Sequence, residues 1–240
     1  MDRFRTFFLV LLACAMASSP LLAADTDAVC TVTFDAAWSE KTHPIQFPAS
    51  AHFSPLIGGT HDALTVFWEP GALASPGIES MAETGSTFPL DTEIEQAIGL
   101  GDAGEVISGG GVDLSPGSVA TDFQATLDHS YVTLVTMIAP SPDWFVGVHG
   151  WPLFSNGRWI EVEVVDLLAY DSGTDSGTTF TSSNQDTSPP QPISRIVASP
   201  FPDEVPLGTF TFQCASNLMF LDGFESGDLS SWSSAVGVGP

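Results

Sequence analysis

Apolar and polar residues alternate with a period of two over several stretches of the chain, a pattern typical of β-strands with one buried face. The segment 119–127 shows this alternation most clearly. The segment 131–138 is apolar on both faces, which indicates a central strand. In the segment 159–170 the alternation changes phase at Val164 and Val165, which favours a single strand with a bulge or with both faces covered.

Two short helices are expected in the middle of the chain. Ser75 is suited to cap the first helix, Pro76 to occupy its first position and Gly85 to end it. The second helix is predicted from Asp91 to about Ile98, with Gly99 as its stop. Each segment carries only a short apolar stripe, so both helices should pack on a larger β-structure.

The remaining pattern completes a β fold. Glycine dominates residues 99–117, which indicates a loop or a bulged edge strand. Residues 174–192 form a polar loop rich in Ser, Thr and Pro, and further short strands are expected at 193–197 and 207–214. Many short strands with two minor helices predict a mainly β protein, an antiparallel β-sandwich.

The two ends of the chain differ from this pattern. Residues 1–24 have a basic start, an apolar centre and small residues before Ala24, as a secretory signal peptide does. An alternative is lipid attachment at Cys14, within Leu-Leu-Ala-Cys. We therefore place one domain at 25–214, followed by a flexible tail, 215–240, with the motif Asp-Gly-Phe-Glu-Ser-Gly-Asp.

Two cysteines remain after the signal peptide. Cys30 shares a strand face with Val32, and Cys214 shares one with Phe212, so both sulfurs should point inward from the first and last strands. A secreted protein meets oxidising conditions, and we expect a Cys30–Cys214 disulfide. Two unpaired buried thiols are the alternative.

The charge is strongly negative. The formal net charge is −24, from 29 acidic and 5 basic residues. Nucleic acids and anionic membranes should be repelled, because both bind basic surfaces. Such acidity suits a cation-binding extracellular protein, although solubility alone explains it equally well.

Three aspartates follow the predicted strands 131–138 and 159–170. Asp143 lies in a Pro-rich loop after the first, and Asp171 and Asp175 lie in a Gly-rich loop after the second. Loops at one edge of a sandwich can bring such carboxylates together, and oxygen ligands of this kind suit Ca²⁺. The alternative is ordinary turn chemistry, in which each Asp bonds its own backbone.

Five motifs in the same order resemble the spondin domain, the N-terminal module of the extracellular-matrix proteins F-spondin and mindin. The resemblance covers residues 30–214. The motifs are Trp38-Ser-x-x-Thr-His-Pro44, Ala51-His-Phe-Ser-Pro-Leu-Ile57, the stretch 68–85 with Ala82-Glu-x-Gly85, Ile138-Ala-Pro-Ser-Pro-Asp-Trp-Phe-Val-Gly147 and Tyr170-Asp-Ser-Gly-Thr-Asp-Ser-Gly177.

The resemblance implies a spondin-like sandwich that binds Ca²⁺ through Asp143, Asp171 and Asp175 and acts in adhesion, without catalysis. The expected partner is an extracellular or cell-surface protein or glycan, not nucleic acid, and no membrane segment is expected after the signal peptide. The tail resembles a signature of secreted bacterial proteins, which suggests a bacterial member. The thrombospondin-type repeats of the animal proteins are absent from this sequence.

Other chemistry-bearing residues favour structural interpretations. His43, His52 and His61 recur every nine residues but lack metal-site spacing, so hydrogen-bonding roles are expected. Glu161 and Glu163 could act as paired carboxylates in a secreted hydrolase, the alternative function, but a solvated strand face fits them better. The tryptophans are expected to pack in the core or in loops: Trp38, Trp68, Trp144 and Trp151.

Overall fold

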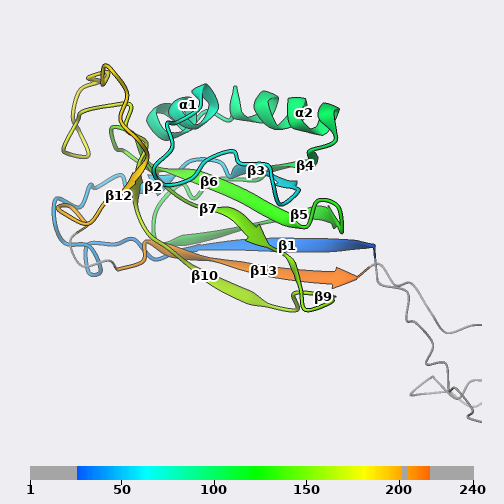
Figure 1. Cartoon of the computed structure of the whole chain (residues 1–240). Helices are drawn as coiled ribbons and strands as arrows, with labels where there is room; N and C mark the ends of the chain where they lie inside the picture. Colours follow the sequence, from blue (N-terminus) through cyan, green and yellow to red (C-terminus); the bar gives the residue numbers. More distant parts are fainter. Residues whose placement is uncertain (1–25, 202–204, 217–240) are drawn as a thin grey trace, which may run out of the picture.

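Two antiparallel β-sheets packed face to face form the body of the protein in a computed structural model that describes residues 26–201 and 205–216 (Figure 1). One sheet has four strands in the order β10-β13-β1-β5. These strands are β1 (Asp27–Ala36), β5 (Gly117–Thr126), β10 (Glu163–Leu167) and β13 (Gly208–Ser216). The predicted antiparallel sandwich is therefore confirmed.

The second sheet has seven strands in the order β12-β11-β7-β6-β3-β4, with β2 paired to β6 beyond the end of β3. Its strands are β2 (His52–Phe53), β3 (Ile57–His61), β4 (Ala103–Ser108), β6 (Tyr131–Ala139), β7 (Trp144–Pro152), β11 (Tyr170–Asp171) and β12 (Ser194–Arg195). A small hairpin joins β8 (Phe154–Ser155) to β9 (Arg158–Trp159).

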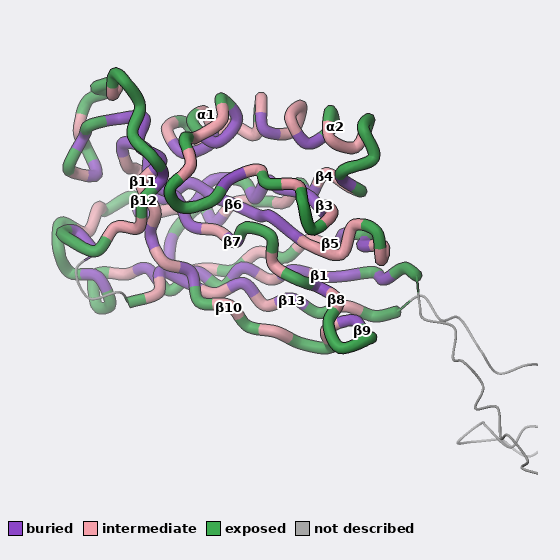
Figure 2. Tube along the Cα trace, viewed as in Figure 1, coloured by how far each residue is buried: buried purple, intermediate pink, exposed green. Residues whose placement is uncertain are grey.

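The helices α1 (Pro76–Thr84) and α2 (Leu90–Leu100) cover the outer face of the seven-stranded sheet, giving three layers (Figure 1). The main core lies between the two sheets and is rich in aromatic rings such as Phe34, Phe210 and Phe212. A second apolar cluster lies between the helices and the sheet, around Ile78 and Phe145. Figure 2 shows this layering, with buried positions along the strands and exposed positions on the outer sides of the helices.

The local predictions that rested on periodicity and caps are confirmed. Strand β6 lies between β3 and β7 and is almost wholly buried, as expected of a central strand. The Ser75 side chain accepts a hydrogen bond from the N–H of Ile78, and Gly85 ends α1 with a φ of 71°. These features depend only on neighbouring residues, which explains why the pattern was sufficient to predict them.

The prediction of one strand over 159–170 is wrong. The segment contains β9, then β10 in the four-stranded sheet, then β11 in the seven-stranded sheet. Within β10 the alternation is regular, with Val164 exposed and Val165 half-buried. The change of phase therefore reflects a crossing between sheets and not a bulge.

Other boundaries also differ from the pattern. Helix α2 continues through Gly99 and ends at Gly101, whose N–H bonds to the carbonyl of Ile98 at 3.0 Å. The glycine-rich segment 99–117 contains the edge strand β4, whose pairing with β3 shifts register beside Ala103, so the edge-strand alternative is the correct one. The strand expected at 193–197 is only the two-residue β12.

The disulfide between Cys30 and Cys214 is confirmed. It joins directly opposed residues of β1 and β13, and Cys30 is completely buried. The signal peptide, Cys14 and the tail motif lie outside the described residues. Among the residues that are described, no helix is long and apolar enough to cross a membrane.

Candidate metal centre

Asp143 is a buried carboxylate at the start of β7. It ends the loop that follows β6, and its side chain is 0% exposed. Its Oδ2 accepts hydrogen bonds from the N–H of Thr174 at 2.8 Å, the N–H of Asp175 at 3.1 Å and the hydroxyl of Ser172 at 3.0 Å. Its Oδ1 is buried and has no hydrogen-bond partner. A buried anionic oxygen left without a partner is costly, which makes this atom a candidate ligand for a cation.

Asp171 and Asp175 lie in the loop that leaves β11, and Asp171 pairs with Trp144 next to Asp143. The Asp171 Oδ1 accepts from the N–H of Gly173 at 2.8 Å. The two oxygens of Asp175 accept from the N–H groups of Gly177, at 2.6 Å, and Gln185, at 2.9 Å. Turn chemistry is therefore present at both residues, and it fixes the direction of both carboxylates.

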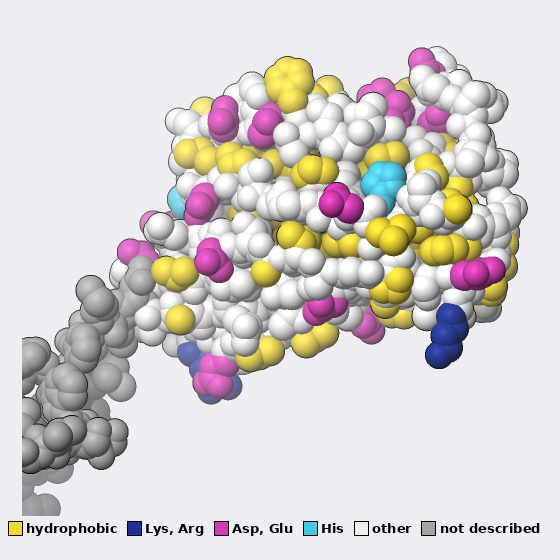
Figure 3. Space-filling model, turned by 180° about the vertical axis from the view of Figure 1, so that it is seen from behind, with side chains coloured by type: hydrophobic (Ala, Val, Ile, Leu, Met, Phe, Trp, Pro, Cys, Tyr) yellow, Lys and Arg dark blue, Asp and Glu magenta, His cyan; other side chains and the backbone are white. Residues whose placement is uncertain are grey.

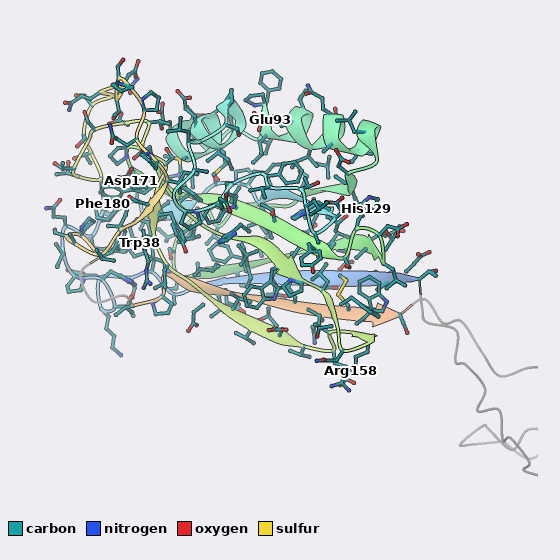
Figure 4. All side chains as sticks on the ribbon, viewed as in Figure 1. Trp38, Glu93, His129, Arg158, Asp171 and Phe180 are labelled. Atoms are coloured by element: carbon teal, nitrogen blue, oxygen red, sulfur yellow. A yellow bond between two sulfur atoms is a disulfide. The ribbon has the colours of Figure 1, made fainter. Side chains whose placement is uncertain are left out.

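Aromatic packing anchors this loop to the sandwich. Phe180, from the loop, packs against Trp38 and Trp144 with ring centroids 5.3 Å apart in each case. Figure 4 shows Asp171, Phe180 and Trp38 at the same end of the molecule. The core placement predicted for Trp38, Trp68 and Trp144 is confirmed, whereas Trp151 is half-buried.

The carboxylates influence one another electrostatically. Burial raises the pKa of Asp171 to about 6, and the negative charges of Asp143 and Asp175 raise it further, against hydrogen bonds from Gly173 and Trp144 that lower it. The structure therefore brings the three predicted aspartates close enough for mutual repulsion. Such repulsion favours either a proton or a bound cation at this place.

The arrangement is not a complete set of metal ligands. Within residues 26–201 and 205–216, no three His, Cys, Asp or Glu side chains gather closely enough to hold a metal ion. Most of the oxygens of the three aspartates face N–H or O–H groups of their own loops. The unpartnered Oδ1 of Asp143 and the all-oxygen donor set nevertheless fit a hard cation.

Sequence reasoning gave no role to Glu83, which lies in the last turn of α1. The Thr174 side chain donates a hydrogen bond to Glu83. Burial raises the pKa of Glu83, and the charges of Glu79, Asp143 and Asp175 raise it further. Its motif, Ala82-Glu-x-Gly85, was visible in the sequence, but only the packing of α1 places it beside the aspartates.

The three histidines lie apart and have structural contacts. His61 is 1% exposed, and its ring nitrogens contact the carbonyl of Asp62 at 2.7 Å and the hydroxyl of Thr133 at 2.8 Å. His43 likewise uses both nitrogens, and one nitrogen of His52 contacts the carbonyl of Ser50. Burial lowers the pKa of His43 and of His61, as expected for neutral hydrogen-bonded rings.

Glu161 and Glu163 do not share a strand face, because Glu161 lies before the start of β10. Both line an open pocket of about 280 Å³ beside the β8–β9 hairpin, together with Arg158. Glu161 is exposed and Glu163 is half-buried, which agrees with a solvated edge. Elsewhere, Figure 3 shows acidic side chains spread over the surface of the face that it presents, with basic side chains only along the lower edge.

Comparison with known proteins gives a consistent relationship. The family model described as Spondin_N matches residues 28–207. The chain is 35% identical to Spondin-2 of Rattus norvegicus over 211 residues, which is 83% of this chain and 63% of the relative. It is 36% identical to Spondin-2 of Homo sapiens over 173 residues, which is 70% of this chain and 52% of the relative.

Spondin-1 of Rattus norvegicus is a further relative, 35% identical over 188 residues, which is 72% of this chain and 23% of the relative. The chain thus spans less than two thirds of the length of these relatives. The matched region contains the sandwich, the helices and all three aspartates. This protein belongs to the spondin family, by a Spondin_N domain that occupies most of its sequence.

Proposed function

We propose that this protein is a secreted, calcium-dependent binding module of the spondin type, which acts in adhesion and not in catalysis. The observation that carries the proposal is the buried Oδ1 of Asp143, which has no hydrogen-bond partner although it belongs to a carboxylate. Asp171 and Asp175 lie close enough to interact with it electrostatically. A divalent cation would satisfy this oxygen and remove the repulsion among the three carboxylates.

Asp143, Asp171 and Asp175 would hold the ion. A carboxylate oxygen has two lone pairs, so the oxygens that accept one N–H group can still ligate a metal. Oxygen ligands on irregular loops favour Ca²⁺ over Zn²⁺, and they suit its variable coordination better than the octahedron that Mg²⁺ requires. The bound ion would fix the loop 171–177 against the start of β7, which would give a partner a defined surface.

The partner that we propose is an extracellular or cell-surface protein or glycan. Membership of the spondin family supports an extracellular role. The relatives are longer than this chain, so their own partners are not transferred to it. A pull-down from the surroundings of the producing cell, with and without chelator, tests this part: a specific partner should be retained only with Ca²⁺.

Calorimetry tests calcium binding directly. The folded protein should bind Ca²⁺, and its melting temperature should rise with Ca²⁺ and fall again with EGTA, because a ligand of the native state stabilises it. The variant Asp175→Asn should weaken both effects. Glu161→Gln is the control and should change neither. No heat of Ca²⁺ binding at millimolar metal would refute the proposal.

Calcium binding should depend on pH through Asp171. Its pKa is raised to about 6 in the folded protein, so below that pH Ca²⁺ must displace a proton. The apparent affinity should fall about tenfold from pH 7 to pH 5. Without metal the sign is reversed: Asp171 stabilises the fold below about pH 4 and loses this contribution as the pH rises through about 6.

The pH prediction is measured by titrating Ca²⁺ into the wild-type protein and into Asp171→Asn at both pH values. The variant should bind more weakly but with a flatter pH profile, because it has no proton to displace at this position. An equally steep profile in the variant would assign the pH dependence to another group.

A further inference from the structure

The last turn of α1 lies over the end of the seven-stranded sheet that carries the three aspartates. Met81 and Ala82 pack in one cluster with Met137 and Ala139 of β6, just before the loop that leads to Asp143. Glu83 follows them directly and is half-buried. In Figure 1, α1 lies at the same end of the molecule as β12, and Figure 4 places Asp171 below this helix.

One hydroxyl group connects Glu83 to the aspartates. The side chain of Thr174 donates to Glu83, and its Oγ1 is also 3.4 Å from Oδ2 of Asp143 and 2.6 Å from Oγ of Ser172. A hydroxyl carries a single proton, so Thr174 can satisfy only one of the two carboxylates at a time. Glu83 therefore shares a hydrogen-bond network with Asp143 in which donors are fewer than negative charges.

The position of Glu83 in its helix is also unfavourable. The C-terminal end of a helix carries a partial negative charge, which favours basic side chains and disfavours acidic ones. Helix α1 has no basic residue in its last turn, and Glu79 lies one turn before Glu83. A carboxylate at this position, beside Asp143 and Asp175, requires a positive charge from outside the helix.

We propose that Glu83 is a fourth carboxylate of the candidate calcium site and that the bound ion ties the C-terminal turn of α1 to the loops of Asp143 and Asp175. The inference rests on the proposed function and adds to it a residue that sets the affinity and a helix that responds to the ion. Affinity for Ca²⁺ rises with the number of carboxylates around the site. Glu83 would act either as a ligand or through water and Thr174.

Titration calorimetry on the full secreted protein tests the affinity. Glu83→Gln keeps the size and the hydrogen-bonding capacity of the side chain but removes the charge, and it should weaken Ca²⁺ binding about tenfold or more. Glu79→Gln is the matched control on the same helix, because Glu79 is exposed, and it should change the dissociation constant less than about twofold. Melting curves without metal show whether each variant folds.

Hydrogen exchange supplies a readout that a purely structural role would not change. Ca²⁺ should slow amide exchange in residues 81–85 of the wild-type protein and of Glu79→Gln, but not in Glu83→Gln. If the wild-type protein binds Ca²⁺ and Glu83→Gln binds it equally well, the inference fails while the proposed function stands. If the wild-type protein binds no Ca²⁺, both fail.

Discussion

Replacing both Cys30 and Cys214 by Ala is expected to lower the free energy of unfolding by about 2–5 kcal/mol. The disulfide closes a loop with a sequence separation of 184 residues, and a long loop restricts the unfolded chain strongly. In the folded protein the two strands are already paired from Ala28 to Ala36, so the main contribution should arise in the unfolded state. Chemical denaturation of both proteins under oxidising conditions measures the difference.

Reduction is the matched control for this prediction. A reductant should lower the stability of the wild-type protein to near that of the double variant and leave the variant unchanged. Alanine is preferred to serine because Cys30 is completely buried and a serine hydroxyl there would need a partner. A difference below about 1 kcal/mol would mean that the pairing of β1 with β13 alone restrains the ends of the domain.

Gly173→Ala is expected to disrupt the loop of the candidate metal centre and to destabilise the protein by at least about 2 kcal/mol. Gly173 has a φ of 78°, which is unfavourable for alanine, and an added Cβ would lie 2.1 Å from the carbonyl oxygen of Gln191. Relief of this clash would break the hydrogen bond from the Gln191 N–H to the Gly173 carbonyl, now 2.8 Å long. Ca²⁺ binding should be lost or greatly weakened, because Gly173 separates Asp171 from Asp175.

Gly157→Ala separates the two causes. Gly157 has the same φ of 78°, but no other group lies within 4 Å of an added Cβ. It should therefore cost only the backbone strain, about 1 kcal/mol, and leave Ca²⁺ binding unchanged. Equal melting temperatures for the two variants would show that the contact with Gln191 does not constrain the loop.

Periodicity and capping chemistry determined much of the fold from the sequence alone. The alternation in β5, the doubly apolar β6 and the caps of α1 each depend on a few neighbouring residues. The pairing of Cys30 with Cys214 was also predictable, because alternation around each cysteine placed both sulfurs on the inner face. Local physics is readable from a local pattern.

The sequence also placed Asp143, Asp171 and Asp175 in loops after strands, and a sandwich gathers such loops at its ends. It did not show that the segment 159–170 divides between two sheets. That division depends on which distant strands accept its hydrogen bonds, namely β13 for β10 and β7 for β11. An alternating pattern is the same whichever partner strand is chosen.

Only the tertiary structure decided what surrounds the three aspartates. The N–H groups around position 174 occupy Oδ2 of Asp143 and leave its Oδ1 without a partner, and the packing of α1 brings Glu83 beside Thr174. These contacts join residues that lie about thirty to ninety positions apart in the sequence. The sequence determined which side chains were available as oxygen ligands, and long-range packing determined which of them share one buried, negatively charged site, because burial and charge repulsion depend on neighbours in space.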